Sequence, residues 1–265
     1  MRSRYRVRLA GVHLDSLDND LLILDVQHSE PEFQITENRN AALAGYDYRT
    51  DNAYFRKTTV TVTFELHIYD VAKRNAACQK VNEWAAAGGS LATNDRPDQI
   101  LRNVRCEKFA SITSAKNWTD PLTLVFSTTY VPYWQSSAES VLNLSGKAPK
   151  GTLKLDGNTG EALVSAEVTA KASVTAFKIT VGDTNVELKG LSLKNGDKLV
   201  IDYARSRYLR IRENKSNSDK MTSVMSLLQP KSTDVLKAPC GAKTTVNISA
   251  NNKVTAAIKA RGLWL

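Results

Sequence analysis

The feature that most constrains this chain is a segment in which apolar and polar side chains alternate, residues 60–69, VTVTFELHIY. One side of an extended chain would carry Val60, Val62, Phe64, Leu66 and Ile68, and the other would carry Thr61, Thr63, Glu65 and His67. A period of two is the signature of a strand with one buried face. We therefore expect a mainly β protein built around this strand.

Further strands are predicted over residues 4–9, 21–26, 100–112 and 122–134. One segment of the first half has a different period. Residues 71–87 place Ala77, Val81, Trp84 and Ala85 at helical spacing. Asp70 suits the N-cap and Gly88-Gly89 suits the end of a helix. We expect one helix at about 70–87 in an N-terminal, β-sandwich-like domain.

The second half has a different character. Short alternating segments separated by turn residues predict a C-terminal β-sandwich or jelly roll. They include strands over 244–248 and 254–260, a hairpin-type turn at Asn195-Gly196 and one helical turn within 224–228. The Ser- and Gly-containing segment 135–150 suggests a boundary, with domains at 1–138 and 139–265. Charge divides likewise: residues 141–265 carry 20 Lys+Arg and 10 Asp+Glu, whereas residues 1–140 carry 16 and 17. The difference predicts distinct partner surfaces for the two halves.

Residues 28–57 form a long segment without a clean period, which is uncommon in a compact domain unless it is functional. Its aromatic residues are Phe33, Tyr46, Tyr48, Tyr54 and Phe55. Aromatic side chains on an extended arm favour docking onto another surface. Two interpretations stay open: a docking arm, or a long hairpin packed on its own domain.

Arg4, Arg6 and Arg8 alternate with apolar residues and would lie on one face of a strand. They can protect a solvated edge strand by charge. Alternatively, they form a subunit contact with acidic residues of a neighbour, such as Asp15, Asp18 and Asp20. Together with the five aromatic residues of the arm, these arginines are the candidate assembly interface.

No motif predicts catalysis, a cofactor or a metal site, so we expect a structural or binding protein and not an enzyme. His13, His28 and His67 have no partner at metal-ligand spacing. The three cysteines lack a C-x-x-C pair, and buried reduced thiols fit best. Asp95 and Asp98 flank Arg96-Pro97 and could act as paired carboxylates, but such a segment is ordinary loop chemistry.

Several partner classes are disfavoured. No apolar run is long enough to cross a membrane, and the N-terminus lacks the apolar region of a secretory signal. Synthesis in the cytoplasm is therefore expected, without membrane insertion. The lysines of the second half are scattered and lack interleaved aromatic residues, which argues against specific nucleic-acid binding.

The order of these segments resembles the distal tail proteins of bacteriophages with long non-contractile tails. The resemblance rests on the opening VRLAGVHLDSLDNDLLILDV, the arm, the strand TTVTVTFELHIYD and the helix ending VNEWAAAGG. It continues through LATNDRPDQILRNVRCEKF, YVPYWQSS, VELKGLSLKNGDKLVIDYARSRYLRIR and the closing AAIKARGLWL.

This resemblance implies a homo-hexameric ring at the tail tip of a virion, with a galectin-like C-terminal β-sandwich. The arm would embrace a neighbouring subunit. Expected partners are the tail tube protein, the tail-associated tip protein and receptor-binding or accessory tail proteins. No cofactor is implied. The alternative is a carbohydrate-binding, lectin-like β-sandwich, although Trp264 is the only tryptophan of the second domain.

Overall fold

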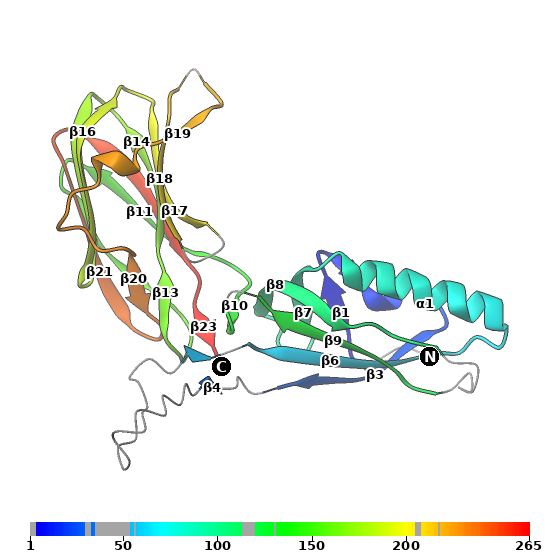
Figure 1. Ribbon diagram of the computed structural model, residues 1–265. Coiled ribbons are helices and arrows are strands. Elements are labelled where there is room, and N and C mark those ends of the chain that lie inside the picture. Colours follow the sequence, from blue (N-terminus) through cyan, green and yellow to red (C-terminus); the bar gives the residue numbers. More distant parts are fainter. Residues whose placement is uncertain are drawn as a thin grey trace, which may run out of the picture. The chain divides into compact units, whose positions relative to one another are not determined.

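The computed structural model describes residues 4–29, 33–34, 54–55, 57–112, 120–129, 131–204, 208–216 and 218–265. The chain divides into two compact units, Met1–Trp134 with Leu265, and Gln135–Trp264 (Figure 1). The protein is mainly β, as the sequence predicts, and its strand ladders are antiparallel.

Unit 1 is built on one sheet in which strands follow the order β2-β1-β7-β8-β9-β6-β3. The bounds are β1 (Val7–Leu9), β2 (Val12–His13), β3 (Leu21–His28), β6 (Thr59–Leu66), β7 (Gly89–Thr93), β8 (Gln99–Lys108) and β9 (Leu122–Thr128). A short 3-10 helix, η1 (Leu14–Ser16), leads from β2 to β3. Strands β4 (Phe33–Gln34) and β5 (Tyr54–Phe55) form a separate pair.

The alternating segment forms β6 and fills the core of unit 1. Val60, Val62, Phe64 and Leu66 are buried, and the threonines between them are half-buried. The strand ends at Leu66 and not at residue 69. Beyond it the backbone N–H of Ile68 donates to the carbonyl of Leu66, and this tight turn leads into the helix. Tyr69 is consequently 77% exposed.

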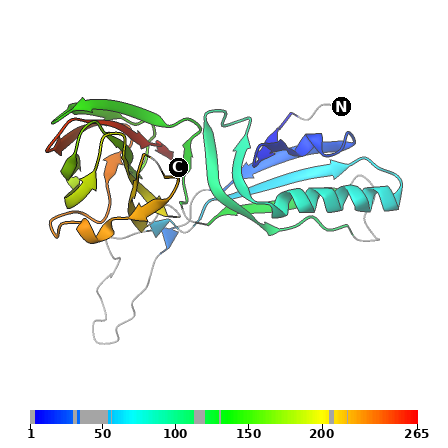
Figure 2. The same cartoon turned by 90° about the horizontal axis from the view of Figure 1, so that it is seen from above.

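The predicted helix is α1 (Val71–Ala86) and lies along one face of the sheet (Figure 2). The carboxylate of Asp70 accepts the backbone N–H of Lys73 at 2.9 Å, which confirms the N-cap. Gly88 ends the helix with a φ of 61°, a conformation that costs glycine little. The buried Trp84 packs edge-on against Phe126 of β9, with ring centroids 5.8 Å apart.

The prediction of one strand over 122–134 is wrong. Strand β9 ends at Thr128, and β10 (Trp134–Ser136) is a separate strand. Pro132 lies between them and has no backbone N–H to donate to a ladder. Similarly, β8 ends at Lys108 and does not reach residue 112.

Unit 2 contains a six-stranded sheet, β11-β22-β14-β17-β18-β19, and a four-stranded sheet, β12-β21-β15-β16. The strands of the six-stranded sheet are β11 (Ser140–Gly146), β14 (Ser165–Ala170), β17 (Lys198–Ala204), β18 (Tyr208–Asn214), β19 (Met221–Ser223) and β22 (Val254–Ala260). Those of the four-stranded sheet are β12 (Lys150–Lys154), β15 (Val174–Val181), β16 (Thr184–Leu193) and β21 (Lys243–Ala250). Alternate residues of both sheets are buried, as in a β-sandwich.

Smaller elements complete unit 2. Strand β13 (Glu161–Leu163) pairs with β20 (Lys237–Pro239), and β10 pairs with β23 (Leu263–Trp264). The predicted helical turn within 224–228 is the 3-10 helix η3 (Met225–Leu227). The turn at Asn195-Gly196 is present, with a φ of 90° at Gly196, but the expectation of a hairpin is wrong. It joins β16 to β17, and these strands belong to different sheets.

Candidate assembly site

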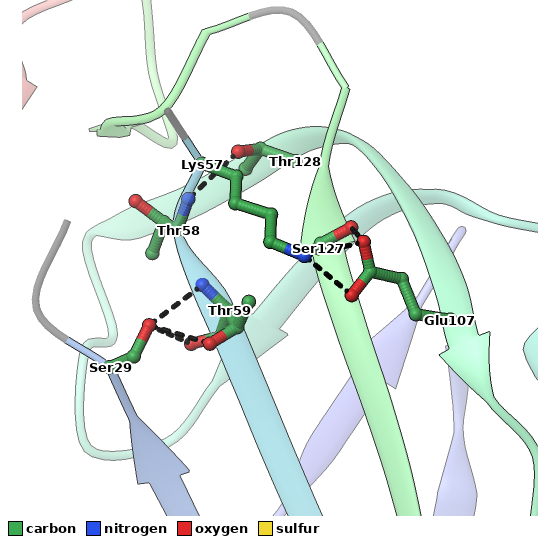
Figure 3. Close-up of polar contacts among 7 residues, drawn as sticks. All are labelled: Ser29, Lys57, Thr58, Thr59, Glu107, Ser127 and Thr128. Atoms are coloured by element: carbon green, nitrogen blue, oxygen red, sulfur yellow. Dashed lines mark hydrogen bonds and ion pairs between the residues drawn. The ribbon is translucent and has the colours of Figure 1, made fainter. Parts of the chain in front are cut away.

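The base of the predicted arm is fixed at the edge of the unit 1 sheet. Strand β3 enters the segment and β6 follows it, and the two strands pair with His28 opposite Val60. The side-chain oxygen of Ser29 accepts the backbone N–H of Thr59 at 3.0 Å and its hydroxyl hydrogen at 2.6 Å (Figure 3). The backbone N–H of Ser29 donates to the carbonyl of Thr59 at 3.0 Å. These bonds hold the two ends of the segment together.

Lys57, at the end of the arm segment, is linked to β8 and β9. Its ammonium group lies 2.8 Å from both carboxylate oxygens of Glu107 (Figure 3). The hydroxyl of Ser127 donates to the same carboxylate at 2.8 Å. These hydrogen bonds, that from Lys57 foremost, hold the pKa of Glu107 below its usual value. Both members of the ion pair are more than a third exposed, so water screens it, and its contribution is at most about 1 kcal/mol.

Thr58 is the buried member of the arm base, with 1% of its surface exposed. Its backbone N–H donates to the hydroxyl oxygen of Thr128 at 3.1 Å, and the N–H of Thr128 donates back to the Thr58 carbonyl at 3.1 Å. The Thr58 hydroxyl donates to the carbonyl of Pro132. Every polar group of this buried residue therefore has a partner, as burial demands.

The aromatic candidates of the arm fall into two groups. Strands β4 and β5 place Phe33 opposite Phe55 and Gln34 opposite Tyr54, so three of the five predicted residues belong to one ladder. Tyr46 and Tyr48 lie outside the described residues. Their role as interface residues stays a prediction.

A second cluster lies where β3 ends, and sequence reasoning missed it. Nε2 of His28 lies 2.6 Å from Oδ2 of Asp95, and the His28 ring meets the buried Trp134 edge-on at 5.1 Å. The guanidinium of Arg96 stacks over Trp134, 5.0 Å from the ring centroid. Burial opposes the charged form of Asp95, but its hydrogen bonds and the charge of His28 keep its pKa below the usual value.

This geometry gives Asp95 a structural partner, whereas the sequence had suggested at most a paired carboxylate with Asp98. No local spacing could reveal the contact, because 67 residues separate Asp95 from His28. His67 is hydrogen-bonded to Glu65 at 2.7 Å.

The arginines form the third feature of unit 1. Val7 and Leu9 are buried, so the exposed Arg6 and Arg8 lie on the opposite face. The side-chain oxygen of Asn94 accepts the backbone N–H of Arg6 at 2.7 Å, and its amide group donates to the carbonyl of Arg4 at 3.1 Å, which holds the chain in place just before β1.

Strand β8 adds two arginines to this exposed face. Leu101 is buried opposite Leu91, which puts Arg102 on the outer face, and Arg105 pairs with Ser127 in the ladder. We call Arg4, Arg6, Arg8, Arg102 and Arg105 the arginine face. None of the five forms an ion pair with another residue that the structure describes.

Strand β1 is not a simple exposed edge, because β2 pairs with it opposite Arg8 and Leu9. Edge protection therefore does not account for Arg8. The acidic residues Asp15, Asp18 and Asp20 lie on η1 and the turn before β3, and they too form no ion pair within the described part of the chain.

Other chemistry is limited. Among the described residues, no group of three or more His, Cys, Asp or Glu side chains could hold a metal ion. Within the same residues, no helix is long and apolar enough to cross a membrane. The cysteines are free, as expected, but only Cys78 is buried, whereas Cys106 and Cys240 are half-buried. Burial raises the pKa of the Cys106 and Cys240 thiols, which disfavours reactive thiolates.

Comparisons with known proteins show a likeness in fold and none in sequence families. No family model matches the chain, and no curated protein matches it either. Among solved structures, SPP1 Dit (gp 19.1), described as a paradigm of the hub adsorption apparatus in phages infecting Gram-positive bacteria, matches with a TM-score of 0.69. The match covers 97% of this chain and 98% of that chain at 13% identity. The chain has the fold of SPP1 Dit.

The resemblance noted in the sequence is thus confirmed as a likeness of fold over both units. Two structures of the phage p2 baseplate in its activated conformation, with strontium or calcium, also match over 97% of each chain. Their TM-scores are 0.48 and 0.49, at 9% identity.

Proposed function

We propose that this chain is a structural, non-enzymatic protein of a phage or prophage tail tip. Six copies form a closed hub that joins the tail tube to the tail-associated tip protein and to proteins of host attachment. The observation that carries the proposal is the match to the SPP1 Dit hub, which extends over both units and nearly the full length of each chain.

The arm base supports association between subunits. Ser29, Thr58 and Thr59 fix both ends of the arm segment against the sheet. A segment anchored at both ends can add contact area to a neighbouring subunit while its own domain stays folded. Head-to-tail contacts must close by rotation, since otherwise they produce open filaments. A closed ring of six satisfies that requirement.

Electrostatics supports a particular head-to-tail contact. The arginine face and the acidic group Asp15, Asp18 and Asp20 carry opposite charges that no ion pair neutralises within the described residues. In a ring, the arginine face of one subunit would meet the acidic group of the next. Complementary charge sets the register of such a contact and disfavours the reversed arrangement.

Charge reversal tests this proposal in the full-length protein. Arg6→Glu with Arg8→Glu should abolish association, measured as mass by light scattering. Adding Asp18→Lys and Asp20→Lys should restore it. Lys189→Glu with Lys220→Glu makes the same change of charge elsewhere and should leave the mass unchanged. An unaltered ring in the arginine variant would overturn the assigned contact.

A second candidate function, carbohydrate binding, is favoured by one feature of unit 2. The outer face of the six-stranded sheet has a shallow hollow of about 360 Å³. Its polar lining includes Asn143, Ser145, Glu167, Thr169 and Thr255. Glu167 also binds the ammonium groups of Lys198 at 2.9 Å and Lys259 at 3.7 Å. Binding of the protein to a glycan array that is lost in Glu167→Ala would support this candidate. An array without any bound protein would exclude the displayed glycans as ligands.

A further inference from the structure

Four strands at one side of the unit 2 sandwich lie in sequence segments without acidic residues. Residues 140–155, which contain β11 and β12, and residues 235–265, which contain β21 and β22, include no Asp or Glu. The topology brings these segments together, because β11 pairs with β22 and β12 pairs with β21. The side of unit 2 formed by these four strands therefore carries a strongly positive net charge.

Some cations of these segments are neutralised by neighbouring elements. Lys237 pairs with Glu161, Lys259 with Glu167, and Arg261 with Glu139. Five exposed lysines form no ion pair with another described residue: Lys147, Lys150, Lys154, Lys243 and Lys253. We call these five residues the lysine edge.

The register places two of these charges against each other. Lys154 of β12 lies directly opposite Lys243 of β21, and like charges at such positions destabilise a sheet. Protection of an exposed edge explains lysines on β12, which is the outermost strand. It does not explain Lys243, because β21 is flanked by β12 and β15. The unneutralised pair therefore points to an anion supplied from outside the chain.

The neighbouring side chains indicate the kind of anion. Thr152 and Thr245 are exposed and lie opposite each other between the lysines, and Asn247 lies opposite Lys150. Hydroxyl and amide groups bind phosphate oxygens and polyol hydroxyls, and lysine contacts phosphate as a point charge.

Protein and nucleic-acid partners fit less well. The cores of protein interfaces are enriched in aromatic residues and arginine and depleted in lysine and serine. Nucleic-acid surfaces for single strands use aromatic side chains on which bases stack. The described strands β12 and β21 contain no aromatic residue and no arginine.

We propose that the lysine edge binds a linear polyol-phosphate polymer of the host cell envelope. The origin of the polymer in the envelope rests on the proposed tail-tip function, whereas the anion-binding chemistry rests on unit 2 alone. The lysines would contact phosphate groups anywhere along the repeating polymer and would not need its terminus. One particle could therefore bind the polymer at many positions. Five lysine–phosphate contacts release counterions, so affinity should fall about a hundredfold between 50 and 200 mM salt.

The test uses the full-length protein and purified, lipid-free poly(glycerol phosphate), with affinity measured by fluorescence polarisation against salt. Lys154→Gln with Lys243→Gln should weaken binding about 25-fold at 0.1 M salt and flatten the salt dependence. The matched control is Lys189→Gln with Lys198→Gln, which removes two lysines that are ion-paired with Glu187 and Glu167. Its affinity should stay within about threefold of the unsubstituted protein.

Two further probes decide the class of partner, namely polyglutamate and single-stranded DNA of matched charge. Tighter binding to poly(glycerol phosphate) than to both supports the proposal. Binding to polyglutamate or DNA that is as tight or tighter overturns it, as does an equal loss in the control variant. A protein that assembles into rings but does not bind the polymer would refute this inference and leave the proposed function standing.

Discussion

Replacing Thr58 by valine should loosen the base of the arm without changing the shape of the side chain. Valine cannot donate to the Pro132 carbonyl, which then loses its partner in a part-buried site. A lost hydrogen bond of this kind costs about 1–3 kcal/mol, and the added methyl group returns up to ~0.8 kcal/mol. We therefore expect the unfolding free energy of unit 1 to fall by about 1–2 kcal/mol.

The assay combines thermal unfolding with amide hydrogen exchange. For a unit of this size, the loss corresponds to a decrease in Tm of roughly 4–8 °C. The amides of Thr58 and Thr128, which bond across the arm base, should exchange faster. Thr61→Val is the control: Thr61 is half-buried on β6, three residues after Thr58, and the change should stay within about 0.5 kcal/mol. Equal Tm values for the two variants would refute the assignment of Thr58 as the anchor.

Three further predictions concern single side chains. Glu107→Gln removes the screened ion pair with Lys57 and should cost less than about 1 kcal/mol in urea unfolding, so a larger loss than that of the Thr58 variant would contradict our ranking. Burial raises the pKa of Tyr203 from 10 to about 12. The neutral phenol therefore contributes roughly 3 kcal/mol to the free energy of unfolding. This contribution is complete below pH 10 and is lost as the pH rises through 12. Tyr203→Phe leaves the backbone N–H of Leu236 without its acceptor, which should lower stability at neutral pH and abolish the alkaline loss in pH-dependent unfolding. Asp70→Ala removes the N-cap of α1 and should lower the Tm, and an unchanged helix signal and Tm would argue against the cap.

Local patterns predicted the regular elements well. The alternation in β6 and the Asp70 cap with Gly88 are signals contained within a few residues, and the structure confirms both. Where a predicted strand was too long, a local feature of the backbone ended it although the alternation of apolar and polar residues continued. Pro132 lies within the predicted strand over 122–134 and interrupts it, and the tight turn at Ile68 ends β6 early.

The candidate site could be predicted only in part. The arm and the arginines have sequence signatures, namely aromatic residues without a period and charges at alternate positions. The contacts that fix the arm do not, because Lys57 and Glu107 are 50 residues apart and His28 and Asp95 are 67 apart. Such pairs depend on which strands become neighbours, and a single sequence does not encode that order locally.

The mass of the full-length protein in solution tests the central claim most directly. A closed ring of six 29.2-kDa chains has a mass of about 175 kDa that does not grow further with concentration. Light scattering after size exclusion should find this plateau, and electron microscopy of the same fraction should show six-fold rings with a central channel. A mass that stays at 29.2 kDa at every concentration, or one that rises without limit, would contradict the account.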